Sequence, residues 1–460
     1  MITVVGAGFA GVEAAWAAAN RGAQVTLIEM RPHKMTPAHT TGHFAELVCS
    51  NSLKSNLPTS PAGLLKAEMT SLGSIVLKLA AEHSVPGGQA LCVNREHFGA
   101  AITQALHDHP NIQVEAREWT PNEFTDLAEK GPVILATGPL STDPVAEWLA
   151  ALTGRKHLYF YDAVSPTVDA STLDREIVFG QSRYDKGGDD YLNCPFNKEE
   201  YYAFVSELVK AERVPFHAFE AGGNREGTGE ATEGQVMEKI QYFAGCMPIE
   251  VIAERGERSL AFGNFKPVGL EDPRTGRRPY AALQLRPENR EKTLYSLVAC
   301  QNRLRFGEQK RVFQMVPGLQ NAEFVRYGVI HRNTYIDAPR VLRKDLSVLG
   351  TPQLILAGQL TGVEGYVESA AIGILAGMVA AAREQGESLA MPPRATAYGS
   401  LLNHLQDQTD RDFAPMNINW GILPDPEEPV RDKGVKREMK LANAHAAFAE
   451  YLAGSSLSPA

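Results

Sequence analysis

Two cysteines of this chain lie in sequence surroundings that favour reactivity over simple burial. Cys49 lies in the polar run "FAELVCSNSLKSN", residues 44–56, and Cys246 lies between Gly245 and Pro248 in "YFAGCMPIEV". The thiolate is the nucleophilic form of cysteine, and a helix N-terminus or a nearby cation favours it. Because serines and asparagines typical of helix caps follow Cys49, we expect this thiol at the start of a helix, close to Lys54. The alternative is an ordinary cysteine with no special role.

The remaining cysteines favour a reduced, metal-free protein. Cys194, in "YLNCPFN", shares the proline-flanked context and stays a third candidate, whereas Cys92 and Cys300 follow apolar runs and are expected in the core. The five cysteines form no CxxC pair and no zinc-ligand spacing. An odd, sparse set is typical of cytoplasmic thiols. The first apolar strand follows Met1 directly and leaves no room for a signal peptide, so we predict a cytoplasmic location.

The elements that must position these cysteines begin at residue 1. The 460 residues, with 44% hydrophobic and 22% charged side chains, indicate a soluble protein of two or three domains. The longest small-apolar run, residues 370–382, is shorter than a membrane span and predicts a buried helix. "MITVVGAG", "AGVEAAWAAANRG" and "AQVTLIEM" predict a strand, a helix and a second strand.

A glycine-rich turn joins the first strand to the helix. Its GxGxxG pattern, in the strand–turn–helix context that a dinucleotide site requires, brings a pyrophosphate to the helix N-terminus. An acidic residue ends the second strand, where it would accept hydrogen bonds from a ribose hydroxyl. The expected cofactor contacts here are Gly6, Ala7, Gly8, Phe9, Ala10, Gly11 and Glu29.

Two later segments indicate that the dinucleotide is FAD. Residues 131–140 predict a strand that ends at Gly138, and residues 352–377 predict a strand, a glycine-rich turn at Gly358 and a helix. Such a late return to the cofactor is expected of flavoproteins, and a simple NAD dehydrogenase does not need it. No second GxGxxG follows a strand between residues 150 and 340. We therefore predict an α/β fold of the Rossmann, glutathione-reductase-like type. Its discontinuous FAD domain comprises residues 1–150 and 341–460, with an inserted α+β domain at 151–340.

The predicted insert is basic within an acidic chain. Residues 255–344 carry 18 Lys and Arg against 8 Asp and Glu, a net of +10, whereas the whole chain carries −9. Aromatic residues alternate with these cations at Phe306, Phe313, Phe324, Tyr327 and Tyr335, which suits unstacked bases and phosphates. The alternative is a salt-bridged surface over buried aromatic faces. The candidate substrate contacts are His331, Arg332 and Asn333, expected in a ligand-facing turn, with Arg303, Arg305, Lys310 and Arg311.

Taken together, these stretches resemble one family, the bacterial folate- and FAD-dependent tRNA (uracil-5-)-methyltransferases, TrmFO. The similar segments run in order from residue 3 to about residue 424. They include "VVGAGFAGVEAAW", "FAELVCSNSLKS", "YLNCPFN", "GCMPIE", "GEQKRVFQMVPGLQNAEFVRYGVIHRNT", "AGQLTGVEGYVESAA" and "PMNINWGILP". The chain departs from the family pattern at Ala244, where an acidic residue is usual, and at Asn264-Phe265.

The resemblance implies methylation at C5 of the T-loop uridine of tRNA (position 54). The carbon would come from 5,10-methylenetetrahydrofolate and the electrons from FADH2, with NADH or NADPH as the electron source. A cysteine thiolate would add to uracil C6 so that C5 can attack the one-carbon unit. The implied pair of catalytic thiols is Cys49, as the nucleophile, and Cys246, as the base; the reverse assignment stays open. Gln359 and Tyr366 would join the cofactor site.

Three other functions are consistent with parts of the sequence. The related MnmG family modifies wobble uridines with the same folate carbon, but normally has a long C-terminal helical extension. A flavin oxidoreductase that acts on small molecules would leave the basic insert unexplained. A tRNA-binding protein with a purely structural FAD would need neither cysteine.

Overall fold

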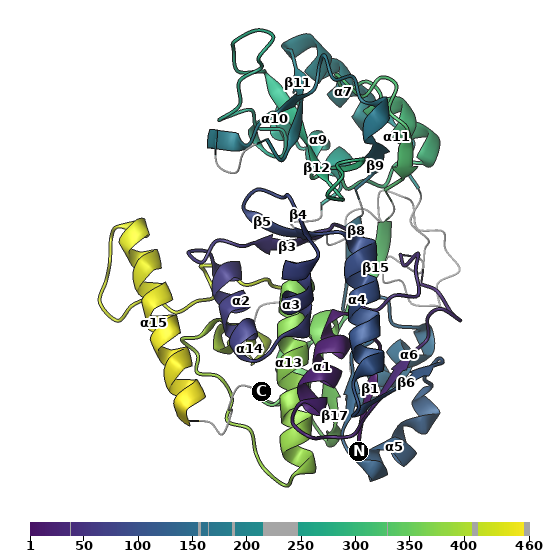
Figure 1. Ribbon diagram of the computed structural model, residues 1–460, viewed down its shortest axis with the longest axis vertical. Helices are drawn as coiled ribbons and strands as arrows, with labels where there is room; N and C mark the ends of the chain where they lie inside the picture. Colours follow the sequence, from purple (N-terminus) through teal and green to yellow (C-terminus); the bar gives the residue numbers. More distant parts are fainter. Residues whose placement is uncertain are drawn as a thin grey trace.

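The computed structural model describes residues 1–36, 38–154, 158–163, 165–185, 189–214, 247–328, 330–406 and 413–454. Figure 1 shows two lobes, a larger one that contains both ends of the described chain and a smaller one above it. The architecture is α/β, as predicted. One buried cluster joins residues 2–149 and 336–451, and a second joins residues 168–322.

The larger lobe is built on a six-stranded sheet of order β16-β17-β7-β1-β2-β6. All neighbours are parallel except β16 and β17, which are antiparallel. Because β1 and β7 are buried apolar runs, they lie in the interior of this sheet. The strands are β1 (Ile2–Val5), β2 (Val25–Glu29), β6 (Ile112–Ala116), β7 (Val133–Leu135), β16 (Ser347–Val348) and β17 (Thr351–Leu356).

Two helices pack side by side in this lobe, α1 (Phe9–Ala19) and α13 (Tyr366–Glu384) (Figure 1). Glycines let them touch, since a Cβ on Gly373 or Gly377 would lie 2.2 or 2.3 Å from backbone oxygens of α1. Helix α13 is long and apolar enough to cross a membrane, but 83% of its most apolar window is buried inside the lobe. It is the buried helix that the small-apolar run predicts.

The other elements of this lobe surround that pair. A small sheet of order β3-β5-β4 lies on the side that faces the smaller lobe. Its strands are β3 (Ser52–Ser55), β4 (Ser84–Val85) and β5 (Ala90–Val93). The helices are α2 (Pro61–Ser71), α3 (Ile75–Glu82), α4 (Arg95–Asp108), η1 (Pro121–Glu123), α5 (Phe124–Lys130), α6 (Asp143–Thr153), α12 (Ala338–Val341), η6 (Gly358–Thr361), α14 (Ala397–Gln406) and α15 (Lys433–Gly454).

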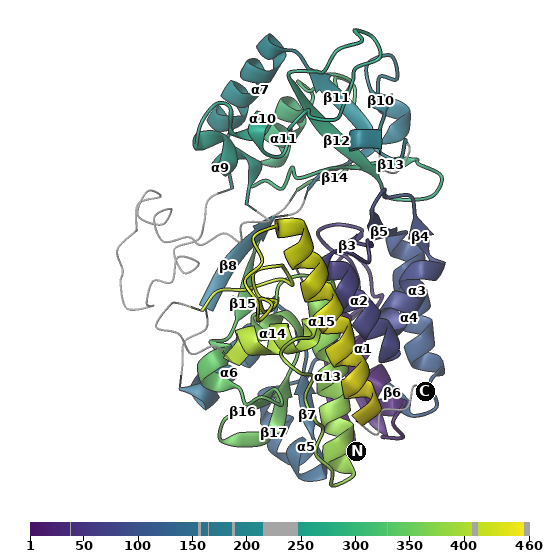
Figure 2. The same ribbon diagram turned by 90° about the vertical axis from the view of Figure 1, so that its left-hand side faces the viewer.

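The smaller lobe contains an antiparallel six-stranded sheet of order β10-β11-β12-β13-β9-β14. Its strands are β9 (Thr167–Asp169), β10 (Phe179–Gly180), β11 (Leu192–Phe196), β12 (Ala281–Pro287), β13 (Leu294–Leu297) and β14 (Phe324–Arg326). Its helices are η2 (Ala170–Thr172), η3 (Arg183–Asp185), α7 (Lys198–Lys210), α9 (Ile249–Glu254), α10 (Ser259–Phe262) and α11 (Phe306–Phe313). Strand β14 forms one edge, on the side that faces the larger lobe (Figure 2).

The chain crosses between the lobes along an antiparallel pair, β8 (Leu158–Ala163) and β15 (Ile330–Tyr335). This pair corrects one prediction. Residues 331–333 lie within a continuous strand rather than in a turn, because each pairs with a residue of β8. A second prediction is also wrong, since β3, and not a helix, follows Cys49.

Candidate active site

The glycine turn after β1 has three distinct steric roles. Gly6 has φ +96°, and a Cβ there would lie 2.6 Å from the carbonyl oxygen of Ala136. A Cβ on Gly11 would lie 1.7 Å from the carbonyl oxygen of Gly6, so this glycine lets the helix approach the turn. A Cβ on Gly8 would meet no protein atom within 4 Å. Gly8 borders a cavity, and its missing side chain leaves room for a ligand there.

That cavity, of about 450 Å³, is formed where the strands of the larger lobe end. Segments far apart in sequence line it: the glycine turn, the end of β2, the chain after β7, the turn after β17 and the Cys49 loop. The lining includes Gly6, Gly8, Phe9, Ala10, Glu29, Cys49, Gly138, Asn333, Gly358, Gln359 and Tyr366, all proposed from sequence. Ala7 and Gly11, also proposed from sequence, are buried in the turn and do not line the cavity.

Glu29 is held in its ionised form at the end of β2. Its carboxylate accepts hydrogen bonds from the Ala7 N–H at 2.7 Å and from the Nε of Arg31 at 2.9 Å. Burial opposes ionisation, but these hydrogen bonds and the Arg31 charge lower the pKa of Glu29 below its ordinary value. A buried carboxylate at this point suits a ribose hydroxyl.

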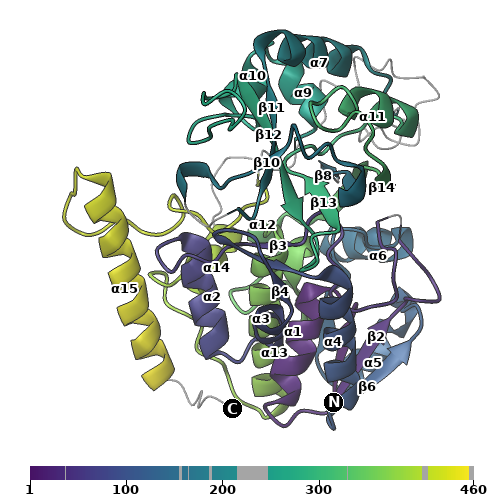
Figure 3. The same ribbon diagram turned by 45° about the horizontal axis from the view of Figure 1, so that its top comes forward.

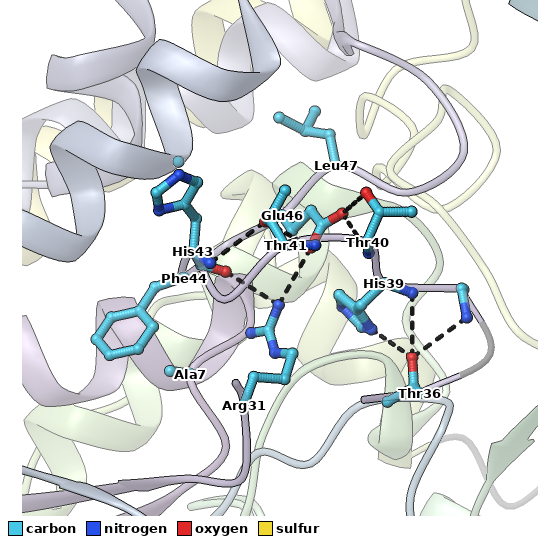
Figure 4. A network of polar contacts seen from close by, with 12 residues as sticks. Ala7, Arg31, Thr36, His39, Thr40, Thr41, His43, Phe44, Glu46 and Leu47 are labelled. Carbon is cyan, nitrogen blue, oxygen red and sulfur yellow. Dashed lines mark hydrogen bonds and ion pairs between the residues drawn. The ribbon is translucent and has the colours of Figure 1, made fainter. Parts of the chain in front are cut away.

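Arg31 also anchors the loop that leads to Cys49 (Figure 4). It donates to the carbonyl of His43 at 2.9 Å and lies 3.5 Å from a carboxylate oxygen of Glu46. Glu46 in turn accepts hydrogen bonds from the N–H and hydroxyl groups of Thr40 and Thr41. Burial would raise the pKa of Glu46, yet these hydrogen bonds keep it lowered. The loop is therefore fixed to the cavity wall.

Cys49 and Tyr366 meet at the cavity, although 317 residues separate them in sequence. The Tyr366 Oη lies 3.0 Å from the Cys49 Sγ and accepts a hydrogen bond of 2.8 Å from the Cys49 N–H. The Tyr366 ring stacks on Phe9 of the glycine turn, with centroids 4.7 Å apart. Burial, and then the neighbouring Cys49, raise the pKa of Tyr366 well above its ordinary value. The phenol stays protonated and can donate to the half-buried sulfur.

The Cys49 loop is held from both lobes by a set of contacts that we call the interlobe clamp. Arg95 of α4 donates to the carbonyl of Leu47 at 3.0 Å and pairs with Glu288, which follows β12, at 2.7 Å. Arg326 of β14 donates to the carbonyl of Val48. The buried Asn51 side chain donates to the carbonyl of Pro287 at 3.1 Å. No sequence motif indicated the clamp.

Further polar groups line the cavity, of which the sequence indicated Lys54 and Asn333 but not Arg286 or Asn417. Lys54 pairs with the buried Glu368 at 2.6 Å, so its amine bonds a carboxylate and not the thiol. Arg286 and Asn417 reach the cavity from β12 and from the chain before α15. The side chain of Asn333 is 1% exposed, and its Oδ1 has no hydrogen-bond partner among the described residues. This oxygen is an acceptor available to a ligand.

The residues proposed for substrate contact do not all gather at one surface. Arg303 is wrong for this role, because it is only 2% exposed and its N–H donates to the buried Glu250. Arg305 and Arg311 are exposed but pair with glutamates, and Lys310 is exposed. Cys246 and the departure at Ala244 lie outside the described residues, as do the side chains of His331 and Arg332, whose backbone lies in β15.

The other cysteines are structural where they are described. Cys92 and Cys300 are buried, as predicted. Cys194 is also buried, in the regular strand β11, which removes it as a candidate nucleophile. Burial raises the pKa of all three thiols, so each stays protonated at neutral pH.

Comparisons with known proteins identify the family of this chain. A family model described as "Glucose inhibited division protein A", GIDA, matches residues 1–388. The chain is 51% identical over 443 residues to methylenetetrahydrofolate--tRNA-(uracil-5-)-methyltransferase TrmFO of Moorella thermoacetica, with 96% of each chain covered. It is 48% identical over 456 residues to the TrmFO of Desulfitobacterium hafniense, with 99% of each covered.

A solved structure shows the same fold. Aquifex aeolicus GidA matches with a TM-score of 0.65 at 15% sequence identity, over 99% of this chain and 76% of that chain. The solved structure shows the fold alone, whereas the sequence identity of about half to TrmFO proteins over nearly their whole length shows the family. The chain belongs to the TrmFO family of methylenetetrahydrofolate--tRNA-(uracil-5-)-methyltransferases, among the GidA-related flavoproteins.

Proposed function

We propose that this chain methylates C5 of the T-loop uridine (position 54) of tRNA, with 5,10-methylenetetrahydrofolate as the carbon donor and FADH2 as the reductant. The observation that carries the proposal is the family membership together with a candidate thiol, Cys49, in the wall of the dinucleotide cavity. NADH or NADPH would reduce the flavin, and the reaction would take place in the cytoplasm.

The cavity fits FAD. The space beside Gly8 would take the pyrophosphate at the N-terminus of α1, and Glu29 would accept from the ribose. The glycines at 138 and 358 line the same cavity and have positive φ. A Cβ on Gly138 would meet no protein atom within 4 Å, which leaves room for the ligand, whereas a Cβ on Gly358 would lie 2.6 Å from the Cβ of Ala10, so this glycine lets its turn approach α1. We assign residues 1–150 and 341–460 to a discontinuous FAD domain and residues 151–340 to an inserted domain on the tRNA side. Bound FADH2 would supply the hydride that completes the methyl group.

Cys49 is the proposed covalent nucleophile. Its thiolate adds to C6 of uracil, and the electron pair moves to C5, which attacks the methylene carbon that folate carries. A base, for which we propose Cys246, then removes the C5 proton while the bond between the methylene carbon and the folate nitrogen breaks, so that tetrahydrofolate leaves. Hydride, which bound FADH2 would supply, reduces the resulting exocyclic methylene to the methyl group as the C6–S bond breaks and releases the thiolate. The uridine must leave its stack to reach this thiol. The clamp fixes the loop so that the sulfur stays in the cavity wall.

Tyr366 is expected to stabilise that thiolate. The variant Tyr366→Phe keeps the ring on Phe9 but removes the donor to sulfur, and a hydrogen bond to a charged group contributes about 1.5–3 kcal/mol. We expect kcat for methyl transfer to fall about 10- to 100-fold and alkylation of Cys49 by iodoacetamide at neutral pH to slow. Tyr202→Phe is the matched control, because among the described residues its hydroxyl bonds another tyrosine of the smaller lobe, Tyr280, at 3.0 Å. Equal rates for Tyr366→Phe and the wild type would exclude this role.

The function itself is tested with purified, flavin-loaded protein. Unmodified tRNA is incubated with methylenetetrahydrofolate labelled in its methylene carbon and with NADH or NADPH. We expect label in 5-methyluridine at the T-loop position and nowhere else in the tRNA. Label at the wobble uridine would indicate MnmG-like chemistry. Oxidation of NAD(P)H without labelled tRNA would indicate a small-molecule oxidoreductase.

A further inference from the structure

Three aromatic rings form a stack at the edge of the smaller lobe that faces the larger lobe. The rings of Phe324 and Tyr327 lie 5.5 Å apart at 13°, and those of Tyr327 and Phe306 lie 5.1 Å apart at 23°. We call these three residues the aromatic ladder. At the inner end of the ladder, the ring centroid of Phe324 lies 6.4 Å from that of the buried Phe313. At the outer end, Phe306 is 57% exposed. The ladder therefore runs from the core to solvent and ends in an open ring.

Buried contacts keep the ladder rigid. The Gln309 side chain of α11 donates to the carbonyls of Leu304 and Gly328, both at 2.8 Å, and accepts from the Gly328 N–H at 2.7 Å. These bonds join the helix that carries Phe306 to the chain just after Tyr327. A stack of three rings that is held in place and open at one end presents a flat aromatic face on which a further ring can stack.

The ladder is adjacent to the proposed active site. A β-bulge separates Phe324 from Arg326, so Phe324 packs into the smaller lobe while Arg326 donates to the carbonyl of Val48, next to Cys49. Tyr327 is the next residue. Figure 3 shows β14 and α11 on the same side of the smaller lobe. Arg326, which lies between Phe324 and Tyr327 in sequence, thus connects the ladder to the loop that carries Cys49.

The charges around Phe306 favour a nucleotide. Lys310 lies one helical turn further along α11, exposed and with no ion pair to any other described residue. Arg305 precedes Phe306 and is 60% exposed; its partner Glu212, at 3.4 Å, is also exposed, so the pair is easily broken. A flat ring flanked by cations matches a base and its phosphates.

We propose that the exposed face of Phe306 is a stacking platform for one unpaired base of the tRNA, close to the uridine that is methylated. This inference rests on the proposed function and adds a substrate-positioning residue to it. The base would extend the ladder by one further ring. Stacking on an aromatic side chain does not depend on base identity, so the platform would contribute affinity and position rather than sequence specificity.

The test uses variants of Phe306 that separate the effect of its aromatic face from the effect of its apolar area. Phe306→Leu keeps apolar area without a π face, Phe306→Trp enlarges the face, and Phe306→Ala removes the side chain. We expect the Leu and Ala variants to raise KM for tRNA about 5- to 100-fold, and the Trp variant to resemble the wild type. Flavin content and flavin reduction by NAD(P)H should not change. Phe262→Leu is the matched control, since Phe262 is 67% exposed on α10 of the same lobe but the guanidinium of Arg258 already lies over its ring, 4.7 Å from the centroid.

A second measurement observes stacking directly. 2-Aminopurine is placed at successive T-loop positions, and its fluorescence is expected to be quenched at one position by the wild type and the Phe262→Leu variant but not by Phe306→Leu. The proposal is overturned if Phe306→Leu has the wild-type KM, or if Phe306→Ala lowers stability or kcat with KM unchanged, as it would if the chain itself covered the ring. A wild-type protein that does not methylate tRNA would instead refute the proposed function.

Discussion

Replacing Cys49 with alanine is expected to abolish methyl transfer to tRNA, with a loss of roughly 1,000-fold or more, because the covalent step has no other route. The variant should stay folded and keep FAD, since the thiol is half-buried at the cavity wall and packs into no core. The measurements are the rate of labelled 5-methyluridine formation and the flavin absorbance of the purified protein. Cys300→Ala is the control, because Cys300 is buried in the other lobe, away from the cavity.

The same variant identifies the nucleophile. A tRNA with 5-fluorouridine at the target position should trap the adduct at C6, since fluorine at C5 blocks the proton removal that precedes elimination. We expect wild-type protein and Cys246→Ala to form this adduct and Cys49→Ala not to form it. An adduct that persists in Cys49→Ala but disappears in Cys246→Ala would exchange the two proposed roles.

Two glycine substitutions three residues apart are expected to impair different properties of the protein, its affinity for FAD and its stability. Gly8→Ala places a methyl group in open space at the cavity, so the protein should fold but bind FAD at least about 100-fold more weakly. Gly11→Ala places its Cβ 1.7 Å from the Gly6 carbonyl oxygen, so helix and turn must separate. Overpacking of this kind costs about 3 kcal/mol of unfolding free energy. FAD titration and thermal unfolding distinguish the two.

Gly307→Ala is the matched control for both, because a Cβ there also meets nothing within 4 Å but the residue lies on α11, away from the cavity. It should change neither FAD affinity nor thermal stability by much. Gly8→Ala with normal FAD affinity would contradict the position we propose for the pyrophosphate. Gly11→Ala with normal stability would contradict the close approach of α1 to the turn.

The parts of the site that depend on local sequence were predictable. The first thirty residues predict a strand, a glycine turn, a helix and a second strand that ends in an acidic residue. The observed elements β1, α1 and β2 match this order. The two later strands were also found, since β7 and β17 are short apolar runs that end in glycine turns. Short-range patterns determine these elements, so they can be read without tertiary contacts.

The errors arise where partners distant in sequence decide the outcome. The residues after Cys49 resemble helix caps, yet Ser52 pairs with Cys92 in a small sheet. Residues 331–333 resemble a turn, yet they pair with β8, about 170 residues earlier. Arg303 was counted as a surface cation, but a carboxylate 53 residues away accepts its N–H inside the core. Charge counts along a chain carry no information about burial.

The interlobe clamp has a consequence for protein engineering. The carbonyls of Leu47 and Val48, just before Cys49, accept from Arg95 of the larger lobe and from Arg326 of the smaller lobe. Asn51, just after Cys49, donates to the carbonyl of Pro287 of the smaller lobe, and Glu288 pairs with Arg95. The lobes therefore cannot be exchanged as independent modules between relatives. A chimera would retain an aligned thiol only where the donor lobe brings an arginine and a carboxylate to these same positions, so the two halves of the clamp must be inherited together.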